Sequence, residues 1–138
     1  MFIAMLGHED FEKTDFSYMR TGIMAGSPCP IKTMQVEKMH MSEICITYGQ
    51  TEASPATTMS KTTDSIETRV NTVGGPIFGV ECRIVDPETN EELPDNVDGE
   101  FVARGYNIMK DYYKMPEATA AKIFILRRLR TFFILTPR

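Results

Sequence analysis

The sequence predicts an α/β fold in which a parallel strand–helix–strand crossover is followed by short antiparallel strands of a small sheet or barrel. An apolar, β-branched run at 44–47 is soon followed by glycine, a pattern typical of a buried strand. Another strand is expected at 19–25, and a segment long enough for a helix separates it from the run at 44–47. Residues 80–86 and 99–104 alternate between polar and apolar, which predicts antiparallel strands.

The first part of the chain is expected to contain a helix at its start and then the helix of the parallel crossover. Residues 1–6 are almost entirely apolar and resemble part of a helix. Pro28 and Pro30 suit the first turn of the crossover helix, where a missing N–H is not needed. Ile31 and Met34 would then lie on its buried side. A strand, a helix and a strand in this order predict a parallel α/β crossover.

Later elements are predicted by composition and turn residues. Residues 53–72 are rich in Thr and Ser, with Lys, Asp and Pro among them and little periodicity, which predicts a surface loop over the site. Residues 87–90 supply turn chemistry between the two alternating runs. A helix is expected from Pro116, with proline in its first turn and an acidic residue beside it.

Composition narrows the classes of partner. A length of 138 residues suffices for one compact domain, and a net charge of −4 with a pI near 5.2 argues against a general nucleic-acid binder. Small-molecule partners are therefore expected. Cys29, Cys45 and Cys82 are odd in number and widely spaced, which fits reduced thiols better than a disulfide framework or a zinc site. With neither a signal-like start nor a run of membrane-spanning length, we expect a cytoplasmic protein without stable membrane insertion.

Chemically versatile residues directly follow the run at 44–47. In open α/β sheets, ligands bind just beyond the carboxyl ends of strands. Tyr48 could offer a flat face to a base, and Gly49 permits close approach of backbone. Thr51 could donate to a phosphate oxygen, and Glu52 could hold a hard cation such as Mg²⁺. The alternative is that these residues only pack and turn at a strand-to-loop junction.

Four motifs carry a resemblance to a known superfamily. They are Ala-Gly-Ser-Pro at 25–28, Tyr-Gly-Gln-Thr-Glu at 48–52, Val-Gly-Gly-Pro at 73–76 and Gly-Glu-Phe-Val-Ala-Arg-Gly at 99–105. In sequence, order and spacing they resemble the adenylate-forming (AMP-binding) superfamily, which includes acyl-CoA synthetases, luciferases and the adenylation domains of peptide synthetases. Residues 24–30 and 50–55 look most like medium- and long-chain fatty-acyl-CoA synthetases. The resemblance implies an internal fragment of the family's large N-terminal domain.

The resemblance implies a cradle for the nucleotide. Tyr48 would stack on the adenine of ATP or AMP, and the backbone of Gly26, Ser27 and Pro28 would line the other side. Two structural alternatives stay open, because Gly26 could simply turn the chain and Tyr48 could be an ordinary packed aromatic. Arg104 is expected to be a structural ion-pair partner rather than a site residue.

The same resemblance implies roles for the residues after Tyr48. Gly49 and Gln50 would lie near the acyl carboxylate. Thr51 would bind the α-phosphate, and Glu52 would coordinate Mg²⁺, which makes these two the expected catalytic residues. Adenylation joins a carboxylate to the α-phosphate of ATP, so growing oxyanion charge must be neutralised there. The implied cofactors are ATP/AMP and Mg²⁺, with CoA as cosubstrate of the complete enzyme.

The expected domain organisation follows the motifs. Residues 1–123 would be a partial AMP-binding domain, with an α/β part carrying the nucleotide motifs at 1–60 and a β-rich part at 73–115. Residues 124–138 hold four arginines and no acidic residue, unlike the chain before them. One hypothesis is a frameshift that replaced the family's continuation. The alternative is a basic amphipathic anchor, with one face formed by Leu126, Leu129 and Phe133.

The resulting functional expectation is a fragment of an ATP-dependent acyl-CoA ligase of fatty acid metabolism. It would activate a fatty acid through an acyl-adenylate and be inactive alone, because the family's phosphate loop and C-terminal lid are absent from the sequence. Its partners would be ATP, fatty acid, CoA and a complementing chain. Two alternatives are a non-catalytic nucleotide-binding or interaction fragment, and part of an aryl- or aminoacyl-activating enzyme.

Overall fold

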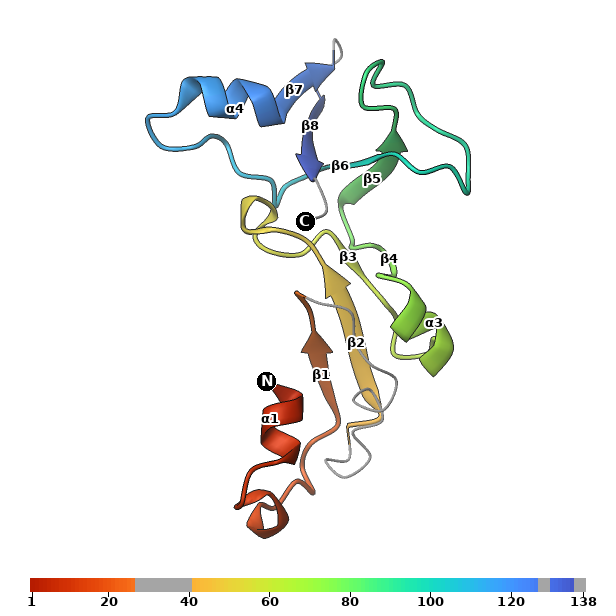
Figure 1. Cartoon of the computed structure of the whole chain (residues 1–138), viewed down its shortest axis with the longest axis vertical. Coiled ribbons are helices and arrows are strands. Elements are labelled where there is room, and N and C mark those ends of the chain that lie inside the picture. Colours follow the sequence, from red (N-terminus) through yellow and green to blue (C-terminus); the bar gives the residue numbers. More distant parts are fainter. Residues whose placement is uncertain (27–40, 127–129, 136–138) are drawn as a thin grey trace. The chain divides into compact units, whose positions relative to one another are not determined.

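A computed structural model of the chain describes residues 1–26, 41–126 and 130–135, with side chains described as far as residue 123 (Figure 1). The chain divides into two compact units. The first unit comprises Met1–Thr47 and Met59–Gly75, and the second comprises Tyr48–Thr58 and Pro76–Arg138. Each unit is built from segments that are separated in the sequence.

The first sheet has the strand order β1-β2-β3-β4. Its strands are β1 (Thr21–Met24), β2 (Glu43–Tyr48), β3 (Thr58–Met59) and β4 (Gly75–Pro76). Strand β1 runs parallel to β2, with Gly22 opposite Ile44. This pairing confirms the predicted parallel connection between the two strands. The predicted crossover helix, with Pro28, Pro30, Ile31 and Met34, lies outside the described residues.

The core of the first unit lies against β2. Ile44 is completely buried, and Cys45 and Ile46 beside it are also buried, as expected for an apolar run in a parallel sheet. Helix α1 (Phe2–Leu6) and the short helix η1 (Phe11–Lys13) contribute apolar side chains to this core. The packed set is Phe2, Met5, Leu6, Phe11, Phe16, Met24, Met41, Ile44, Ile46 and Val70.

The prediction of a surface loop at 53–72 is wrong. This segment starts at the last residue of the short helix η3 (Thr51–Ala53) and contains strand β3 and helix α3 (Ile66–Asn71). Ser65 caps α3 by accepting a hydrogen bond from Thr68 N at 3.0 Å. Buried Arg69 on α3 donates to the carbonyl of Ile44 at 2.6 Å. The polar composition indicated a solvated loop, whereas its side chains serve as a cap and as partners for buried backbone groups.

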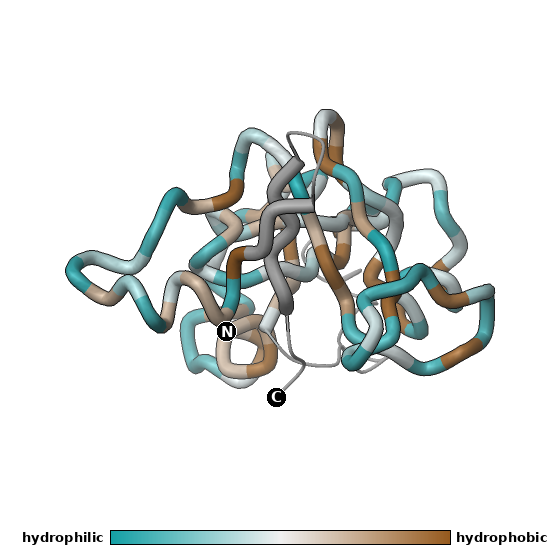
Figure 2. Tube along the Cα trace, turned by 90° about the horizontal axis from the view of Figure 1, so that it is seen from above, coloured by the Kyte–Doolittle hydropathy of each residue, from teal (hydrophilic) through white to brown (hydrophobic). Residues whose placement is uncertain are grey.

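The second sheet is antiparallel and has the strand order β5-β6-β8-β7. Its strands are β5 (Val80–Val85), β6 (Glu100–Gly105), β7 (Ile123–Leu126) and β8 (Arg130–Leu135). The first two confirm the predicted alternating strands, and α4 (Pro116–Lys122) confirms the predicted helix. Within the described residues the pairing does not return from β7 to β5, so the sheet is open and the barrel alternative is wrong. Figure 2 shows short apolar stretches alternating with hydrophilic ones along the trace.

The tail forms strands where the structure describes it. Strand β7 and strand β8 pair with each other, and β8 pairs with β6. Leu129 of the proposed anchor face lies outside the described residues, and the anchor alternative stays a prediction. The frameshift hypothesis stays a prediction.

Arg104 is a structural residue of the second sheet, as predicted. It lies opposite Glu81 in the pairing of β5 with β6, and the two side chains form an ion pair. The Arg104 side chain is almost fully buried, whereas the Glu81 side chain is half exposed. Loss of the glutamate alone would leave a guanidinium charge with a weaker set of partners in a buried place.

Candidate functional site

The predicted motif begins at Tyr48, the last residue of β2, and continues into a tightly closed loop that ends at Thr57. Thr57 returns to the end of the strand, where its backbone N–H and its hydroxyl both donate to the carbonyl of Tyr48, at 2.9 and 3.0 Å. Between them, η3 turns the chain, and Ser54 ends it in the left-handed conformation at φ 52°. Thr57 is completely buried although its neighbours along the loop include exposed residues. The loop is therefore an ordered turn of the second unit.

Gly49 is required by the backbone of the loop itself. A Cβ atom at this position would lie 2.0 Å from the carbonyl oxygen of Pro55 and 2.8 Å from Cα of Ala56. No side chain fits at such separations, because the obstructing atoms belong to the backbone. The sequence predicted that backbone approaches Gly49 closely, and in the structure this backbone is that of Pro55 and Ala56. A location of Gly49 and Gln50 near an acyl carboxylate stays a prediction.

Tyr48 has a packing role in the second unit. Its ring meets that of Phe101 edge-on, with centroids 5.4 Å apart and an interplanar angle of 88°. Its hydroxyl oxygen is buried and, among the described residues, meets no partner at full hydrogen-bond geometry, although the Gln50 side chain interacts with it. Burial raises the pKa of this phenol above its ordinary value, and the Gln50 side chain offsets part of the rise. This geometry supports the packed-aromatic alternative, and stacking on adenine stays a prediction.

Glu52 is held at both its side chain and its backbone. The hydroxyl of Tyr112 donates to Oε1 of Glu52 at 2.7 Å, and the backbone N–H of Met109 donates to the Glu52 carbonyl at 2.8 Å. The hydrogen bond that the Tyr112 hydroxyl donates to Glu52 stabilises the protonated phenol, so it raises the pKa of Tyr112 above its ordinary value. Burial of the phenol and the negative charge of Glu52 raise this pKa further. The carboxylate is half-buried and keeps a defined orientation.

The remaining predicted site residues are distributed over both units. Thr51 is exposed at the first position of η3 in the second unit. Gly26 belongs to the first unit and follows β1 at φ 83°, and a Cβ atom added there would meet no atom within 4 Å. The positive φ requires glycine for backbone reasons, in line with the turn alternative. Ser27 and Pro28 lie outside the described residues.

Sequence reasoning missed Asn107, which holds the loop closed. Its side-chain nitrogen donates to the carbonyls of Ala53 and Ala56, at 2.9 and 2.6 Å. Asn107 is buried, with 7% of its surface exposed. Two donors on one amide nitrogen match two carbonyls that the turn leaves without a partner in a helix or sheet. Asn107 lies more than fifty positions from Ala53 and Ala56, so no local sequence pattern indicates these hydrogen bonds.

The donor set fits a cation that arrives with a nucleotide. Over the described ranges 1–26 and 41–123, no cluster of three or more His, Cys, Asp or Glu side chains could hold a metal ion. Mg²⁺ is usually bound through one or two carboxylates together with substrate phosphates and water, rather than by a cage of protein ligands. A single oriented carboxylate at Glu52 is consistent with that arrangement.

A family model identifies the class of protein. Residues 1–113 match the model described as AMP-binding enzyme. This chain therefore belongs to the AMP-binding enzyme family, as its four motifs predicted.

Curated relatives are acyl-CoA ligases by name. The chain is 49% identical over 125 residues to YngI of Bacillus subtilis (strain 168), a protein provisionally named an acyl-CoA synthetase, covering 89% of this chain and 23% of that protein. It is 42% identical over 121 residues to the mitochondrial medium-chain acyl-CoA ligase ACSF2 of Danio rerio, covering 86% and 20%. The chain thus spans about a fifth of the length of these relatives.

Solved structures confirm the predicted fold class. A long-chain-fatty-acid-CoA ligase of Archaeoglobus fulgidus superposes with a TM-score of 0.72 at 25% identity, over 86% of this chain and 25% of that one. ATP-bound MatB of Rhodopseudomonas palustris gives 0.66 at 30% identity, over 86% and 22%. These likenesses agree with the predicted α/β fold of part of an adenylate-forming enzyme, whereas the division into an α/β part at 1–60 and a β-rich part at 73–115 stays a prediction.

Location in the cell stays a prediction. None of the helices within the described residues is both long and apolar enough to span a bilayer. Relatives such as ACSF2 carry a mitochondrial designation in their names, so similarity does not select the cytoplasm.

Proposed function

We propose that this chain supplies part of the ATP site of an ATP-dependent acyl-CoA ligase that activates a medium- or long-chain fatty acid through an acyl-adenylate. The observation that carries the proposal is the Tyr48–Glu52 motif, which begins at the last residue of parallel strand β2 and continues into the ordered loop beyond its carboxyl end. Ligands bind at this place in open α/β sheets. Similarity to proteins named as acyl-CoA ligases supports the reaction class.

In the proposed site, aromatic and backbone groups hold the nucleotide base. Tyr48 would contribute a ring face to adenine while its edge-on contact with Phe101 keeps the ring oriented. Gly26, Ser27 and Pro28 would contribute backbone to the other side of the base. A half-buried aromatic that is already ordered loses little conformational freedom when it binds a ligand.

The phosphate end of the proposed site is formed by Thr51 and Glu52. The hydroxyl of Thr51 belongs to an exposed residue and is available to donate to an α-phosphate oxygen. Glu52 would hold the Mg²⁺ of the nucleotide through its carboxylate. When bound through Glu52, Mg²⁺ would supply Lewis-acid stabilisation of the charge that develops during acyl transfer. CoA would serve as the acyl acceptor of the complete enzyme.

Nucleotide binding to the chain tests the first part of the proposal. Isothermal titration with ATP and AMP should give binding that Thr51→Ala weakens about tenfold, the loss expected for a hydrogen bond to a charged group. Thr62→Ala changes another exposed threonine and should leave the affinity unchanged. Equal binding by all three proteins would contradict the assigned role of Thr51.

Substrate-dependent pyrophosphate exchange tests the reaction class in the complete enzyme of which the chain is proposed to be part. Exchange that depends on fatty acids supports the acyl-CoA ligase, whereas dependence on aryl or amino acids selects the other adenylate-forming activities. Nucleotide binding without exchange by any acid supports a non-catalytic nucleotide-binding fragment.

We also propose that residues 1–123 form the AMP-binding part and that 124–138 lie outside the family pattern. The family match ending at residue 113 supports this division. Sequencing the locus past codon 123 and translating all three frames tests the frameshift hypothesis. A family-like continuation in another frame supports it, and its absence in all frames contradicts it.

A further inference from the structure

We propose that Asn107 is a positioning residue for Thr51: by holding the backbone of the loop at 49–57, its amide fixes the direction in which the Thr51 hydroxyl meets an α-phosphate oxygen. The inference rests on the proposed function, since it concerns the phosphate contact of that same site. Asn107 lies outside the Tyr-Gly-Gln-Thr-Glu motif, and its side chain reaches the loop from the segment that follows β6.

Every carbonyl from residue 50 to residue 53 accepts a hydrogen bond. The first two accept from N–H groups three positions later along the chain, at 2.9 and 3.2 Å. The third accepts from Met109 N at 2.8 Å, and the fourth accepts from Asn107 Nδ2 at 2.9 Å. The short helix η3 is therefore closed at its end by two donors from a distant segment, and its first residue belongs to a fully bonded turn.

The Asn107 amide joins two points of the loop. Its nitrogen donates to the carbonyl of Ala53 at 2.9 Å and to that of Ala56 at 2.6 Å. Carbonyl oxygens can only accept, so the nitrogen of the amide rather than its oxygen must face them. Because Asn107 is buried, water competes little for these bonds. A single side chain thus ties the end of η3 to the returning part of the loop.

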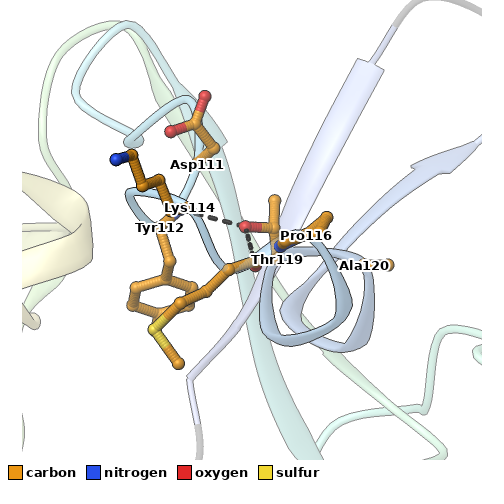
Figure 3. A pocket seen from close by; sticks show the side chains of 7 residues that line it. Asp111, Tyr112, Lys114, Pro116, Thr119 and Ala120 are labelled. Atoms are coloured by element: carbon orange, nitrogen blue, oxygen red, sulfur yellow. Dashed lines mark hydrogen bonds between the residues drawn. The ribbon is translucent and has the colours of Figure 1, made fainter.

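The segment that carries Asn107 is shaped around its amide and is anchored to helix α4. A Cβ atom on Gly105 would lie 2.8 Å from the Asn107 side-chain oxygen, so glycine at the end of β6 leaves the space that the amide occupies. Further along, the backbone N–H of Tyr112 donates to Oγ1 of Thr119 on α4 at 3.0 Å (Figure 3). The Thr119 hydroxyl donates in turn to the carbonyl of Met115 at 2.9 Å. The amide is therefore presented to the loop by backbone that β6 and α4 hold.

A fixed backbone at Thr51 fixes the direction of its hydroxyl. Threonine is β-branched and has few χ1 rotamers, so the direction of its O–H follows the backbone. A hydrogen bond weakens steeply when its donor is misaligned, and a side chain that is oriented before the ligand arrives loses less freedom on binding. Asn107 should therefore strengthen phosphate binding without touching the phosphate.

The proposed base contact has other supports. The ring of Tyr48 packs against Phe101, and its carbonyl accepts from Thr57. Loss of the Asn107 amide should therefore weaken the binding of a nucleotide but not that of the nucleoside without its phosphate. An amide that only stabilised the fold would affect both ligands alike.

The test uses AMP and adenosine as probes and Asn107→Leu as the variant. Leucine has a similar shape to asparagine but carries neither donors nor charge, so it cannot repel a phosphate. Calorimetry should show AMP binding weakened about fivefold, less than the loss expected for Thr51→Ala, with adenosine binding unchanged. Asn71→Leu changes an exposed asparagine in the same way and should bind both ligands like wild type.

Further measurements separate positioning from folding. The backbone order parameter of Thr51, measured by NMR relaxation, should fall from about 0.85 in wild type to about 0.6 in Asn107→Leu, with β2 unchanged. Thr51→Ala should lower AMP affinity less in the Asn107→Leu background than in wild type, because both changes act on one contact. If Asn107→Leu fails to fold, Asn107→Ser keeps one hydroxyl donor and should give a smaller loss of AMP affinity.

The outcomes distinguish this inference from the proposed function. Wild-type AMP affinity in folded Asn107→Leu overturns the positioning role, and so does an equal loss of AMP and adenosine binding. A wild-type chain that binds neither ligand contradicts the proposed function. The order parameter of Thr51 then decides the positioning role, which is supported if it falls in Asn107→Leu and overturned if it does not.

Discussion

Strand β2 and the loop after it are stabilised in different ways. Along β2, Ile44 and Ile46 are buried among other apolar side chains of the first unit, and Cys45 between them is also buried. The loop of the second unit is held instead by directed hydrogen bonds from residues such as Asn107 and Tyr112. Apolar packing is non-directional and supplies stability, whereas hydrogen bonds fix the orientation of particular groups. Removing apolar contacts of β2 should therefore lower the stability of the chain most. Removing hydrogen bonds of the loop should instead affect ligand binding most.

Truncating Ile44 should give the largest loss of stability. Ile44→Ala leaves a cavity at a completely buried position, and we expect the free energy of unfolding to fall by about 2–5 kcal/mol. Urea unfolding followed by circular dichroism measures it. Ile23→Ala makes the same chemical change on β1, where 53% of the residue's surface is exposed, and should cost much less. Equal losses would show that the core does not centre on β2.

Substituting Gly49 should have the next largest effect, and it acts on the loop. Gly49→Ala forces the returning backbone at Pro55 and Ala56 to move, at an expected cost of about 3 kcal/mol. Gly75→Ala is the matched control, since a Cβ there would meet no atom within 4 Å. Urea unfolding and ATP titration of both variants provide the measurement. A Gly49→Ala protein with unchanged stability and affinity would contradict the tightly closed loop.

Removing the Asn107 amide should loosen the loop with a smaller loss of global stability. Asn107→Asp preserves the shape of the side chain but replaces two donors by an acceptor, so the carbonyls of Ala53 and Ala56 lose their partner, at about 2 kcal/mol. Hydrogen exchange of residues 50–57 should speed up more than that of β2. Asn71→Asp, at an exposed position, is the control. Uniform acceleration over both regions would mean that strand and loop open together.

The contrast also explains what could be predicted from the sequence. Strands at 44–47, 80–86 and 99–104 were predicted because apolar periodicity records burial directly. Helix α3 was missed because its stability depends on a Ser65 cap and on Arg69 binding backbone carbonyls, and these contacts leave no periodic pattern. The motif loop was found from its own residues.

The residues that hold the loop could not be found in the same way. Asn107 and Tyr112 contact it across more than fifty positions of sequence. A single polar side chain at such a separation carries no local pattern, because its partners are chosen by the fold. Hydrophobic periodicity therefore predicts the apolar core. A sequence motif does not predict the distant side chains that hydrogen-bond to it.

The smallest effect should come from a turn that is held by directed hydrogen bonds but lies in solvent. Asp86 accepts from the N–H groups of Thr89 and Glu88 at 2.9 and 2.8 Å, and these bonds hold its pKa below the ordinary value. A lowered folded-state pKa contributes stability above the unfolded pKa, near pH 4, and the contribution is lost as the pH falls through the folded value.

Asp86→Asn keeps an acceptor oxygen without the charge, so it should unfold at slightly lower urea than wild type at pH 7, with the difference shrinking toward pH 3. Urea midpoints of the two proteins at both pH values provide the measurement, with Asp98→Asn as the control for loss of a surface charge. A difference that is the same at pH 7 and pH 3 would mean that the charge of Asp86 does not strengthen its turn. Water competes for the exposed N–H donors that bind Asp86, so Asp86→Asn should lower stability less than Asn107→Asp does. The comparison tests whether burial strengthens the hydrogen bonds of the loop.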